Sequence, residues 1–283
     1  MEIKWGSDLA ICWTKMVGPS RSTISELAVY TKYVRVLQNH LKRKLKILVL
    51  GSTPEFRDWA FEENMEVTVM DYSLEYHNTI SREIRHKCIL DMKESNEKLI
   101  CKNWTELDAT LKYDIIIGDL VIGNILPNEL ENFIYKISNA LEDDGLFLGK
   151  SFFVPKNYKT IPPQELLENY YKGPPYHPYS ALAFDLTMFC IDENNMLSFK
   201  KQYNELLKLK QQGLITNETM SHFENVGWDK EMKFYFYVPY AEEYESLIKK
   251  YLNIFCVEYG NDIYSDKFPL YIITNKNSKL FRR

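Results

Sequence analysis

Long apolar runs, glycine and cysteine are all scarce in this 283-residue chain. No stretch approaches the roughly 18 consecutive apolar residues of a membrane span, and the first residues lack the apolar centre of a secretory signal. Only 11 glycines and 11 prolines are present, which excludes collagen-like and linker-dominated architectures. The five cysteines are an odd number without a Cys-x-x-Cys pair, which disfavours a disulfide framework and a zinc site. These absences predict a cytoplasmic protein with reduced thiols.

An excess of positive charge is missing too, because 39 acidic residues outnumber 35 basic ones and leave a net charge of −4. Proteins that bind bulk nucleic acid usually carry a basic surplus, since contacts with phosphate supply most of their affinity. A local exception is the stretch 1–45, with eight Lys and Arg against three acids. Most of these charges lie at one end of a regular apolar stripe, which is typical of the charged end of a packed helix. We therefore expect no membrane partner and regard bulk nucleic acid as an unfavoured one.

Short apolar runs alternate with amphipathic segments in the first half of the chain. The expected strands cover 46–50, 67–71, 98–103, 114–119 and 146–153, and the expected helices cover 24–43, 56–63, 74–94 and about 128–141. This alternation predicts a parallel, doubly wound sheet with right-handed crossovers. The pattern resumes with a strand-like run at 234–238, and strands at 253–258 and 270–274 are joined by a loop, which predicts an antiparallel pair. The expected fold is α/β, with a mostly parallel seven-stranded sheet, an antiparallel last strand and helices on both faces.

Ligands of open parallel sheets bind beyond the carboxyl ends of the strands. The first expected strand ends at Gly51-Ser52-Thr53-Pro54 and leads into a helix N-terminus, which offers free N–H groups. Asp71 closes the second strand 20 residues after Gly51, where a carboxylate can accept two hydrogen bonds from a ribose diol. These features fit either a nicotinamide dinucleotide or S-adenosylmethionine.

Three features favour S-adenosylmethionine. The dinucleotide fingerprint is Gly-x-Gly-x-x-Gly, whereas Gly51-Ser-Thr-Pro-Glu-Phe56 has one glycine and a phenylalanine in the third glycine's place. Glu55 would also face the pyrophosphate, and a carboxylate opposes an anion but tolerates a sulfonium with a free amino group. The closing antiparallel pair is the wrong ending for a standard dinucleotide fold.

On these residues the chain resembles the class I S-adenosylmethionine-dependent methyltransferases, which are Rossmann-like, over about 45–154 and 233–275. The resemblance implies a cofactor site made of Gly51, Ser52 and Thr53 at the methionine part, Asp71 at the ribose, Tyr72 beside the adenine, and Asp119 and Leu120 beneath the methionine. It also implies an adenine-binding pair after the third strand. Asn103-Trp104 fills that place because it lies 11 residues before Asp114 and leaves an intact helix over 74–94, while Asp91-Met92 is the competing alignment.

The resemblance implies in-line transfer of a methyl group to a small-molecule or peptide acceptor, with S-adenosylhomocysteine as the product. Gly149-Lys150-Ser151-Phe152 stands where metal-dependent relatives carry an Asp-Asn pair, so we expect metal independence. Asp119 is followed by Leu120 and not by the Pro-Pro-aromatic run of enzymes that methylate exocyclic amines, which argues against a flipped base as acceptor. The single glycine keeps open a non-catalytic S-adenosylmethionine-binding regulatory or scaffold protein. An RNA methyltransferase and an NAD-dependent reductase are less favoured alternatives.

Residues for the acceptor are harder to identify. His177, in Pro-Pro-Tyr176-His-Pro-Tyr179, is the candidate general base, although this run also fits a proline-rich surface turn. Tyr176 and Lys150 are candidate substrate contacts. Arg21 could pair with the methionine carboxylate or remain solvated.

Proline clusters between 155 and 232 interrupt the strand–helix rhythm and separate short helical pieces around 164–171, 180–190 and 199–212. The chain therefore divides into four expected parts. They are an N-terminal helical segment covering the cofactor site (1–44), the cofactor-binding core (45–154), a helical cap (155–232) and the C-terminal completion of the core sheet (233–283).

Overall fold

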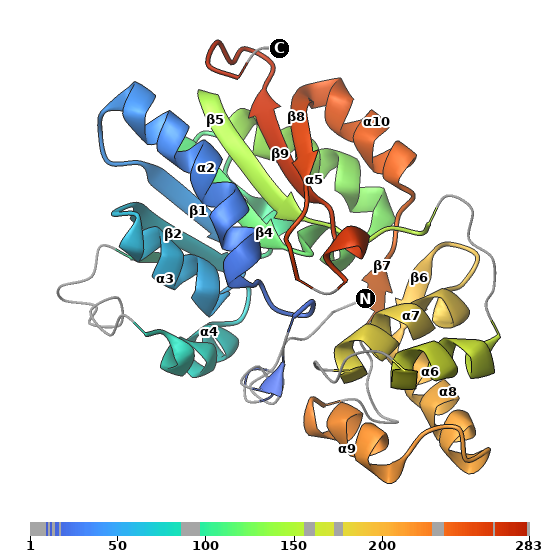
Figure 1. Ribbon diagram of the computed structural model, residues 1–283. Helices are drawn as coiled ribbons and strands as arrows, with labels where there is room; N and C mark the ends of the chain where they lie inside the picture. The colour runs from blue at the N-terminus through green and yellow to red at the C-terminus, as the bar shows by residue number, and fades with distance from the viewer. Residues whose placement is uncertain are drawn as a thin grey trace.

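The computed structural model describes residues 10, 12, 15–16, 18–85, 97–155, 162–172, 178–227, 235–262 and 264–281. Its main sheet contains β1 (Lys46–Leu50), β2 (Glu66–Asp71), β3 (Lys98–Cys101), β4 (Tyr113–Asp119), β5 (Leu141–Lys150), β8 (Leu252–Glu258) and β9 (Leu270–Asn275). Within the described residues the sheet has seven strands in the order β3-β2-β1-β4-β5-β9-β8 (Figure 1). The first five strands run parallel, and β9 is antiparallel to both β5 and β8. The predicted fold class is therefore confirmed.

Helices cover both faces of this sheet. On one face α2 (Ile24–Leu41) and α3 (Pro54–Glu62) pack on Ile47 and Val49 of β1. On the other face α5 (Pro127–Ala140) and α10 (Ala241–Tyr251) pack with Leu48 and Leu50 of the same strand. Successive side chains of a strand point to opposite faces, so a continuous apolar run can serve both layers.

The helix expected over 74–94 is much shorter in the structure, which corrects that prediction. Helix α4 (Leu74–Ile80) is followed by the 3-10 turn η2 (Ser81–Glu83), after which Ile84 has extended backbone angles. Ser81 Oγ donates to the carbonyl of His77 at 2.7 Å, and the backbone N–H of Arg85 donates to Asp58 instead of continuing the helix. These side-chain bonds compete with the helical ladder and end it. Residues 86–96, including Asp91-Met92, lie outside the described residues.

The strand-like run at 234–238 does not rejoin the main sheet, so that prediction was wrong. Strand β7 (Tyr235–Tyr237) pairs antiparallel with β6 (Met196–Ser198) in a separate two-stranded sheet. Strand β7 contacts the 3-10 turn η5 (Val121–Asn124), which follows β4. A Cβ added to Gly123 in this turn would lie 2.0 Å from the Phe236 ring. Glycine at position 123 thus makes room for Phe236, and β7 docks beside β4 without extending the sheet.

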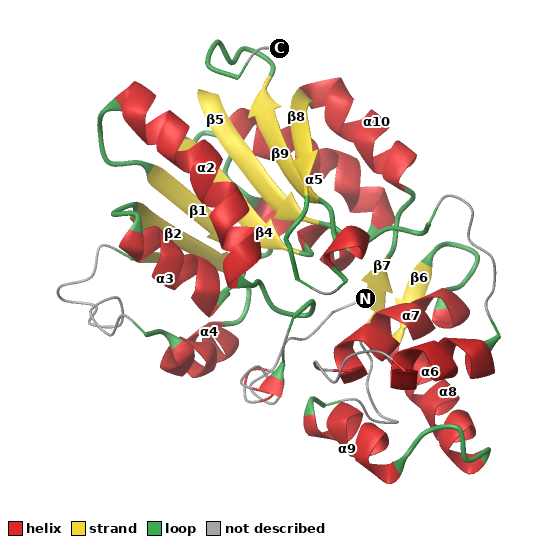
Figure 2. Ribbon diagram, viewed as in Figure 1, coloured by secondary structure: helices red, strands yellow, loops and turns green. Residues whose placement is uncertain are grey.

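The segment between β5 and β8 carries α6 (Pro163–Lys172), α7 (Pro178–Cys190), α8 (Phe199–Gln211) and α9 (Asn217–Asn225) as a group beside the main sheet (Figure 2). These helices share one apolar cluster with Ala10, Met16, and Tyr76 and Ile80 of α4. A second cluster joins Phe152 and Phe268 of the core to the β6–β7 region. The helical group is thus attached near the carboxyl ends of the strands. In the described part of the chain, no helix combines the length and apolar character needed to cross a membrane.

Candidate functional site

The carboxyl ends of β1, β4 and β5 hold buried polar atoms that lack hydrogen-bond partners. Among the described residues, the buried side-chain atoms in this state are Tyr30 Oη, Glu55 Oε2, Asp119 Oδ1, Asn124 Oδ1 and Ser151 Oγ. Glu55 follows β1, Asp119 and Asn124 lie at the end of β4, and Ser151 follows β5. Burial, and then the charges of Glu26 and Asp119, raise the pKa of the Tyr30 hydroxyl on α2. Buried polar groups normally have partners, so this gathering marks a site for a polar ligand.

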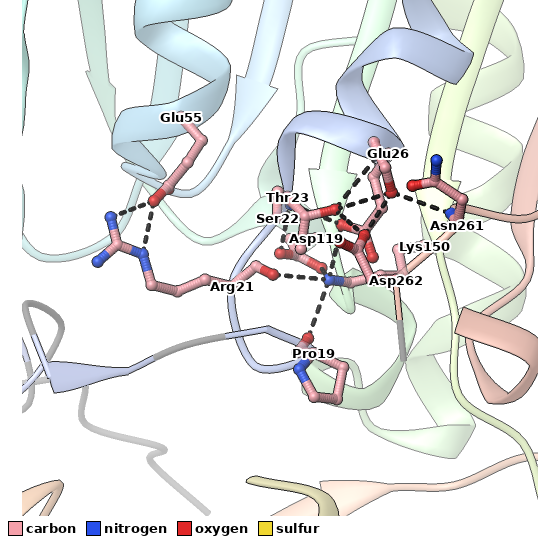
Figure 3. A network of polar contacts seen from close by, with 11 residues as sticks. Pro19, Arg21, Ser22, Thr23, Glu26, Glu55, Asp119, Lys150, Asn261 and Asp262 are labelled. Atoms are coloured by element: carbon pink, nitrogen blue, oxygen red, sulfur yellow. Dashed lines mark hydrogen bonds and ion pairs between the residues drawn. The ribbon is translucent and has the colours of Figure 1, made fainter. Parts of the chain in front are cut away.

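Lys150, at the end of β5, lies at the centre of the network in Figure 3. Its Nζ donates to the Pro19 carbonyl at 2.9 Å and to Glu26 Oε2 at 3.1 Å. The same Nζ lies 3.1 Å from Asp119 Oδ1, as an ion pair without hydrogen-bond geometry. Burial alone would lower the pKa of Lys150, but Asp119 and Glu26 outweigh burial and raise it. Lys150 is therefore a buried cation that ties the N-terminal segment and α2 to the sheet.

Glu26 is a buried carboxylate of this network with a raised pKa. It is 3% exposed, and burial raises its pKa from 4.5 to about 7, with Asp119 adding to the rise while Lys150 opposes it. The ammonium of Lys150 balances the charge of only one of the two neighbouring carboxylates, Glu26 and Asp119. Asp119 also accepts a hydrogen bond of 2.7 Å from Ser22 Oγ. The pair thus has one negative charge more than Lys150 balances, which favours a proton on Glu26.

Replacing Glu26 with Gln is expected to change how stability depends on pH. Because the folded pKa is raised, the folded chain holds a proton between pH 4.5 and about 7 that the unfolded chain has lost, so this contribution is present at acid pH and disappears as pH rises. In the Gln variant that contribution, on the order of 1–3 kcal/mol, is absent. Urea unfolding of both proteins across this pH range measures it. An identical pH slope for both proteins would contradict the assignment.

Arg21 crosses from the N-terminal segment to the first turn of α3. Its Nε donates to Glu55 Oε1 at 2.6 Å, and its Nη2 forms an ion pair with the same oxygen. The second oxygen of Glu55 is the buried atom without a partner, and burial raises the pKa of this carboxyl, with Asp119 contributing to the rise. From the sequence, Arg21 was expected either to pair with the methionine carboxylate or to remain solvated. In the structure it pairs with Glu55.

The loop after β1 is held against the end of β2. Gly51 has φ +90°, in the left-handed region that favours glycine, and its N–H donates to the Met70 carbonyl at 2.9 Å. Asp71 Oδ2 accepts from the Ser52 N–H at 3.0 Å and from Ser52 Oγ at 2.8 Å, while Oδ1 accepts from the Ser73 N–H at 3.0 Å. Three of the roughly four acceptor positions of this carboxylate are therefore used by the chain itself. Thr53 begins α3 as expected, but its side chain makes no capping hydrogen bond.

Asn103 and Trp104 follow β3, and Trp104 lies beside the loop after β1. Trp104 Nε1 donates to the Met70 carbonyl at 2.7 Å, and its Cζ2 lies 3.2 Å from where a Gly51 Cβ would be. The indole thus covers the glycine. Asn103 starts the 3-10 turn η4 (Trp104–Glu106), and its side-chain oxygen accepts from the Thr105 N–H at 3.0 Å. Tyr72, next to Asp71, is 37% exposed.

Leu120 has an uncommon backbone conformation directly after Asp119. Its φ of 51° lies in the left-handed region, where a branched side chain costs about 1–2 kcal/mol. Its carbonyl accepts from Asn124 Nδ2 at 3.0 Å and its N–H donates to the Lys150 carbonyl at 3.2 Å, which hold the turn in place. Such strain is concentrated at functional sites.

Other residues predicted for the site either have surroundings that differ from the prediction or lie outside the described residues. Lys150, expected to contact substrate, is 1% exposed and is occupied by the buried network. Tyr176 and His177 lie outside the described residues, so their roles remain predictions. Across the described ranges, no three His, Cys, Asp or Glu side chains are grouped as metal ligands.

Four residues in these contacts were not predicted from the sequence as site residues: Ser22, Glu26, Tyr30 and His77. Glu26 had a visible signal, because Thr23-x-x-Glu26 is a capping box, and that box is present in the structure. The capping box accounts only for the hydrogen bonds between Glu26 and Thr23. The contact of Glu26 with Lys150 joins residues 124 positions apart and follows from the tertiary fold.

Comparison with known proteins gives the fold. No family model and no curated protein matches this sequence. PKMT2 from Rickettsia typhi, solved with AdoHcy, matches 95% of this chain and 56% of its own at 16% identity and a TM-score of 0.53. A putative Zn-dependent alcohol dehydrogenase from Rhodobacter sphaeroides matches 96% of this chain and 99% of its own at 15% identity and a TM-score of 0.52. At identities of 15–16%, what these structures share with the chain is the fold. The chain has the Rossmann-like fold of the class I methyltransferases.

Proposed function

We propose that the protein is an S-adenosylmethionine-dependent methyltransferase of the cytoplasm that acts on a small-molecule or peptide acceptor without a metal ion. The observation that carries this proposal is the pair of buried acidic oxygens near the carboxyl ends of β1 and β4, where Glu55 Oε2 has no hydrogen-bond partner and Asp119 Oδ1 is held by an ion pair with Lys150. Carboxylates only accept hydrogen bonds when ionised, so they select a ligand that brings donors and positive charge. S-adenosylmethionine has both, in its ammonium and its sulfonium.

The charges of the site fit this cofactor. Three carboxylates, Glu26, Glu55 and Asp119, face the two cations Arg21 and Lys150, and one negative charge remains when all are ionised. S-adenosylmethionine carries one net positive charge. The pyrophosphate of a nicotinamide cofactor is anionic, and burying it beside these acids would be unfavourable. The balance therefore favours the sulfonium compound over the dinucleotide.

Different residues would bind the two ends of the cofactor. Glu55 and Asp119 would accept from the ammonium of the methionine part, and Asp71 Oδ1 would accept from the ribose beneath Tyr72. Trp104 would present its indole face to the adenine. The cofactor supplies the electrophilic methyl group, so the protein has to align an acceptor and keep water out.

The position of Lys150 supports metal independence. Its ammonium lies 3.1 Å from both Glu26 Oε2 and Asp119 Oδ1, which is where a cation would neutralise two carboxylates. A divalent ion would have to displace a buried side chain that also holds the Pro19 carbonyl.

Calorimetric titration with S-adenosylmethionine, S-adenosylhomocysteine and NADH tests this function first. We expect micromolar binding of the first two and none of NADH. Binding of NADH alone would overturn the proposal. Binding without methyl transfer to any acceptor in a broad screen would instead support a regulatory or scaffold role for the same site.

Replacing Trp104 with Ala is expected to weaken S-adenosylhomocysteine binding by about tenfold, because stacking on an aromatic ring contributes about 1–3 kcal/mol per base. Trp104→Phe is the matched control. It keeps an aromatic face but loses the bond from Nε1 to the Met70 carbonyl, so its loss of affinity should be smaller. Unchanged affinity in the Ala variant, with a loss in Met92→Ala, would move the adenine to the competing pair.

A further inference from the structure

Beneath the loop after β1, three buried side chains form a continuous row of polar contacts. Ser52 Oγ lies 2.8 Å from Asp71 Oδ2 and 2.9 Å from His77 Nδ1. The exposed fractions are 1% for Ser52, 5% for Asp71 and 8% for His77. Water therefore has little access to these atoms, and their hydrogen bonds have to be satisfied among themselves.

The number of protons in this row fixes the direction of each bond. An ionised carboxylate only accepts, and a serine hydroxyl has one proton to donate. If Ser52 donated to His77, its oxygen would face Asp71 Oδ2 at 2.8 Å with no proton between them. The arrangement that satisfies both contacts has Ser52 donating to Asp71 and the Nδ1–H of His77 donating to Ser52.

The other side of the imidazole supports a neutral ring with this proton position. His77 Nε2 lies 4.0 Å from Glu97 Oε1, too far for a hydrogen bond, and Glu97 is already paired with Arg57 at 2.6 Å. Burial, followed by the charge of Arg57, lowers the pKa of His77 to about 4. The ring is therefore neutral near pH 7, and its single N–H proton resides on Nδ1.

We propose that His77, held as the Nδ1–H tautomer, is a positioning residue of the cofactor site that commits the Ser52 hydroxyl proton to Asp71. The proposal rests on the proposed function, since it assigns Asp71 to the ribose of the cofactor. His77 touches neither the cofactor nor the acceptor and acts through Ser52.

This arrangement determines which oxygen of Asp71 can serve a ligand. Ser52 fills Oδ2 with two hydrogen bonds, from its N–H and its Oγ, whereas Oδ1 receives one, from the Ser73 N–H. One acceptor position therefore remains on Oδ1. Without the donor at position 77, the Ser52 hydroxyl could rotate, and the carboxylate would lose a restraint that points Oδ1 toward the ribose.

The tautomer can be measured without any ligand. Long-range ¹H–¹⁵N correlation spectra of the full chain near pH 7 should show His77 protonated at Nδ1 and unprotonated at Nε2. The chain has five histidines, and the signals that vanish in His77→Asn assign the ring. The Nε2–H tautomer at this residue would overturn the proposal.

Three variants separate positioning from simple packing. In His77→Asn the side-chain amide can occupy the place of Nδ1 and donate to Ser52, so affinity for S-adenosylhomocysteine should stay within about threefold. In His77→Gln the amide reaches the place of Nε2, and in His77→Leu the donor is gone. Both should bind about tenfold more weakly, as expected for one lost hydrogen bond. Equal losses in Asn and Gln would overturn the proposal, and thermal unfolding of each variant confirms that the proteins compared are folded.

The outcomes distinguish this inference from the function on which it rests. If the unchanged chain fails to bind S-adenosylhomocysteine, the proposed function and the cofactor role of His77 are both refuted. If the unchanged chain binds and all three variants bind as tightly, His77 alone loses its role and the function stands.

Discussion

Replacing Lys150 with Met is expected to lower the free energy of unfolding by about 3–5 kcal/mol, because the change leaves two buried carboxylates facing each other without a cation. Glu26 and Asp119 both lie 3.1 Å from Nζ, and their side chains are 4% and 6% exposed. Methionine fills a similar volume, so the loss comes from charge and hydrogen bonds and not from a cavity. Urea unfolding near pH 7 measures it.

A second substitution tests the cause. Adding Glu26→Gln to Lys150→Met removes one of the two unpaired charges, so the double variant should recover part of the lost stability. The difference between the double variant and the sum of the single variants gives the coupling between the two residues. Strict additivity would show that Glu26 and Lys150 do not act as a pair, contrary to the distance between them.

The core sheet could be predicted because its information is local. In β1 the apolar run Ile47–Leu50 has to be buried on both faces, and the glycine that follows stops it. Helix α2 begins where its capping box places it, with Thr23 as the N-cap residue. Asp71 ends β2 and Asn103-Trp104 follows β3, and residues that end parallel strands meet at one edge of the sheet, while their roles toward a cofactor remain predictions.

The parts that were not predicted depend on contacts between distant residues. Phe236 docks on Gly123, and nothing near position 236 distinguishes a strand of the main sheet from one outside it. The end of α4 depends on Asp58 of α3, whose carboxylate accepts a hydrogen bond from the backbone N–H of Arg85. Lys150 was predicted to contact the substrate because the sequence places it near the end of the fifth strand. Its burial under the N-terminal segment could not be read from the sequence.

The site also explains why one glycine is sufficient in the loop after β1. Additional glycines would serve close approach to a pyrophosphate, but here the space above Gly51 is used by the Trp104 indole, 3.2 Å from the position of a Cβ. The remaining loop positions carry side chains that hold the loop. Ser52 binds Asp71, and Glu55 binds Arg21 of the N-terminal segment. The loop is therefore stabilised by polar side chains, and this matches a ligand that needs acceptors more than it needs N–H donors.

Replacing Arg57 with Met is also expected to cost about 3–5 kcal/mol of unfolding free energy, since it breaks a buried ion pair from one side. The Arg57 side chain is fully buried, its Nε and Nη2 donate to Glu97 at 2.9 and 2.6 Å, and its Nη1 donates to Ser81 Oγ at 2.8 Å. Adding Glu97→Gln to Arg57→Met removes the carboxylate left behind and should restore part of the stability. If the double variant is no more stable than Arg57→Met, the unpaired charge of Glu97 is not the cause.

The same variant should also change the titration of His77, and the sign of the effect follows from linkage. The folded pKa of about 4 lies below the ordinary 6.5, so between these values the unfolded chain binds a proton that the folded chain does not. This contribution to stability is present above pH 6.5 and is lost as pH falls toward 4. Met at position 57 removes the charge of Arg57 and leaves Glu97, 4.0 Å from His77 Nε2, without its cation, so the pKa of His77 should rise. NMR titration of His77 measures this shift directly. An unchanged pKa, together with the loss of stability, would show that the charge of Arg57 supports the fold without acting on the row that orients Asp71.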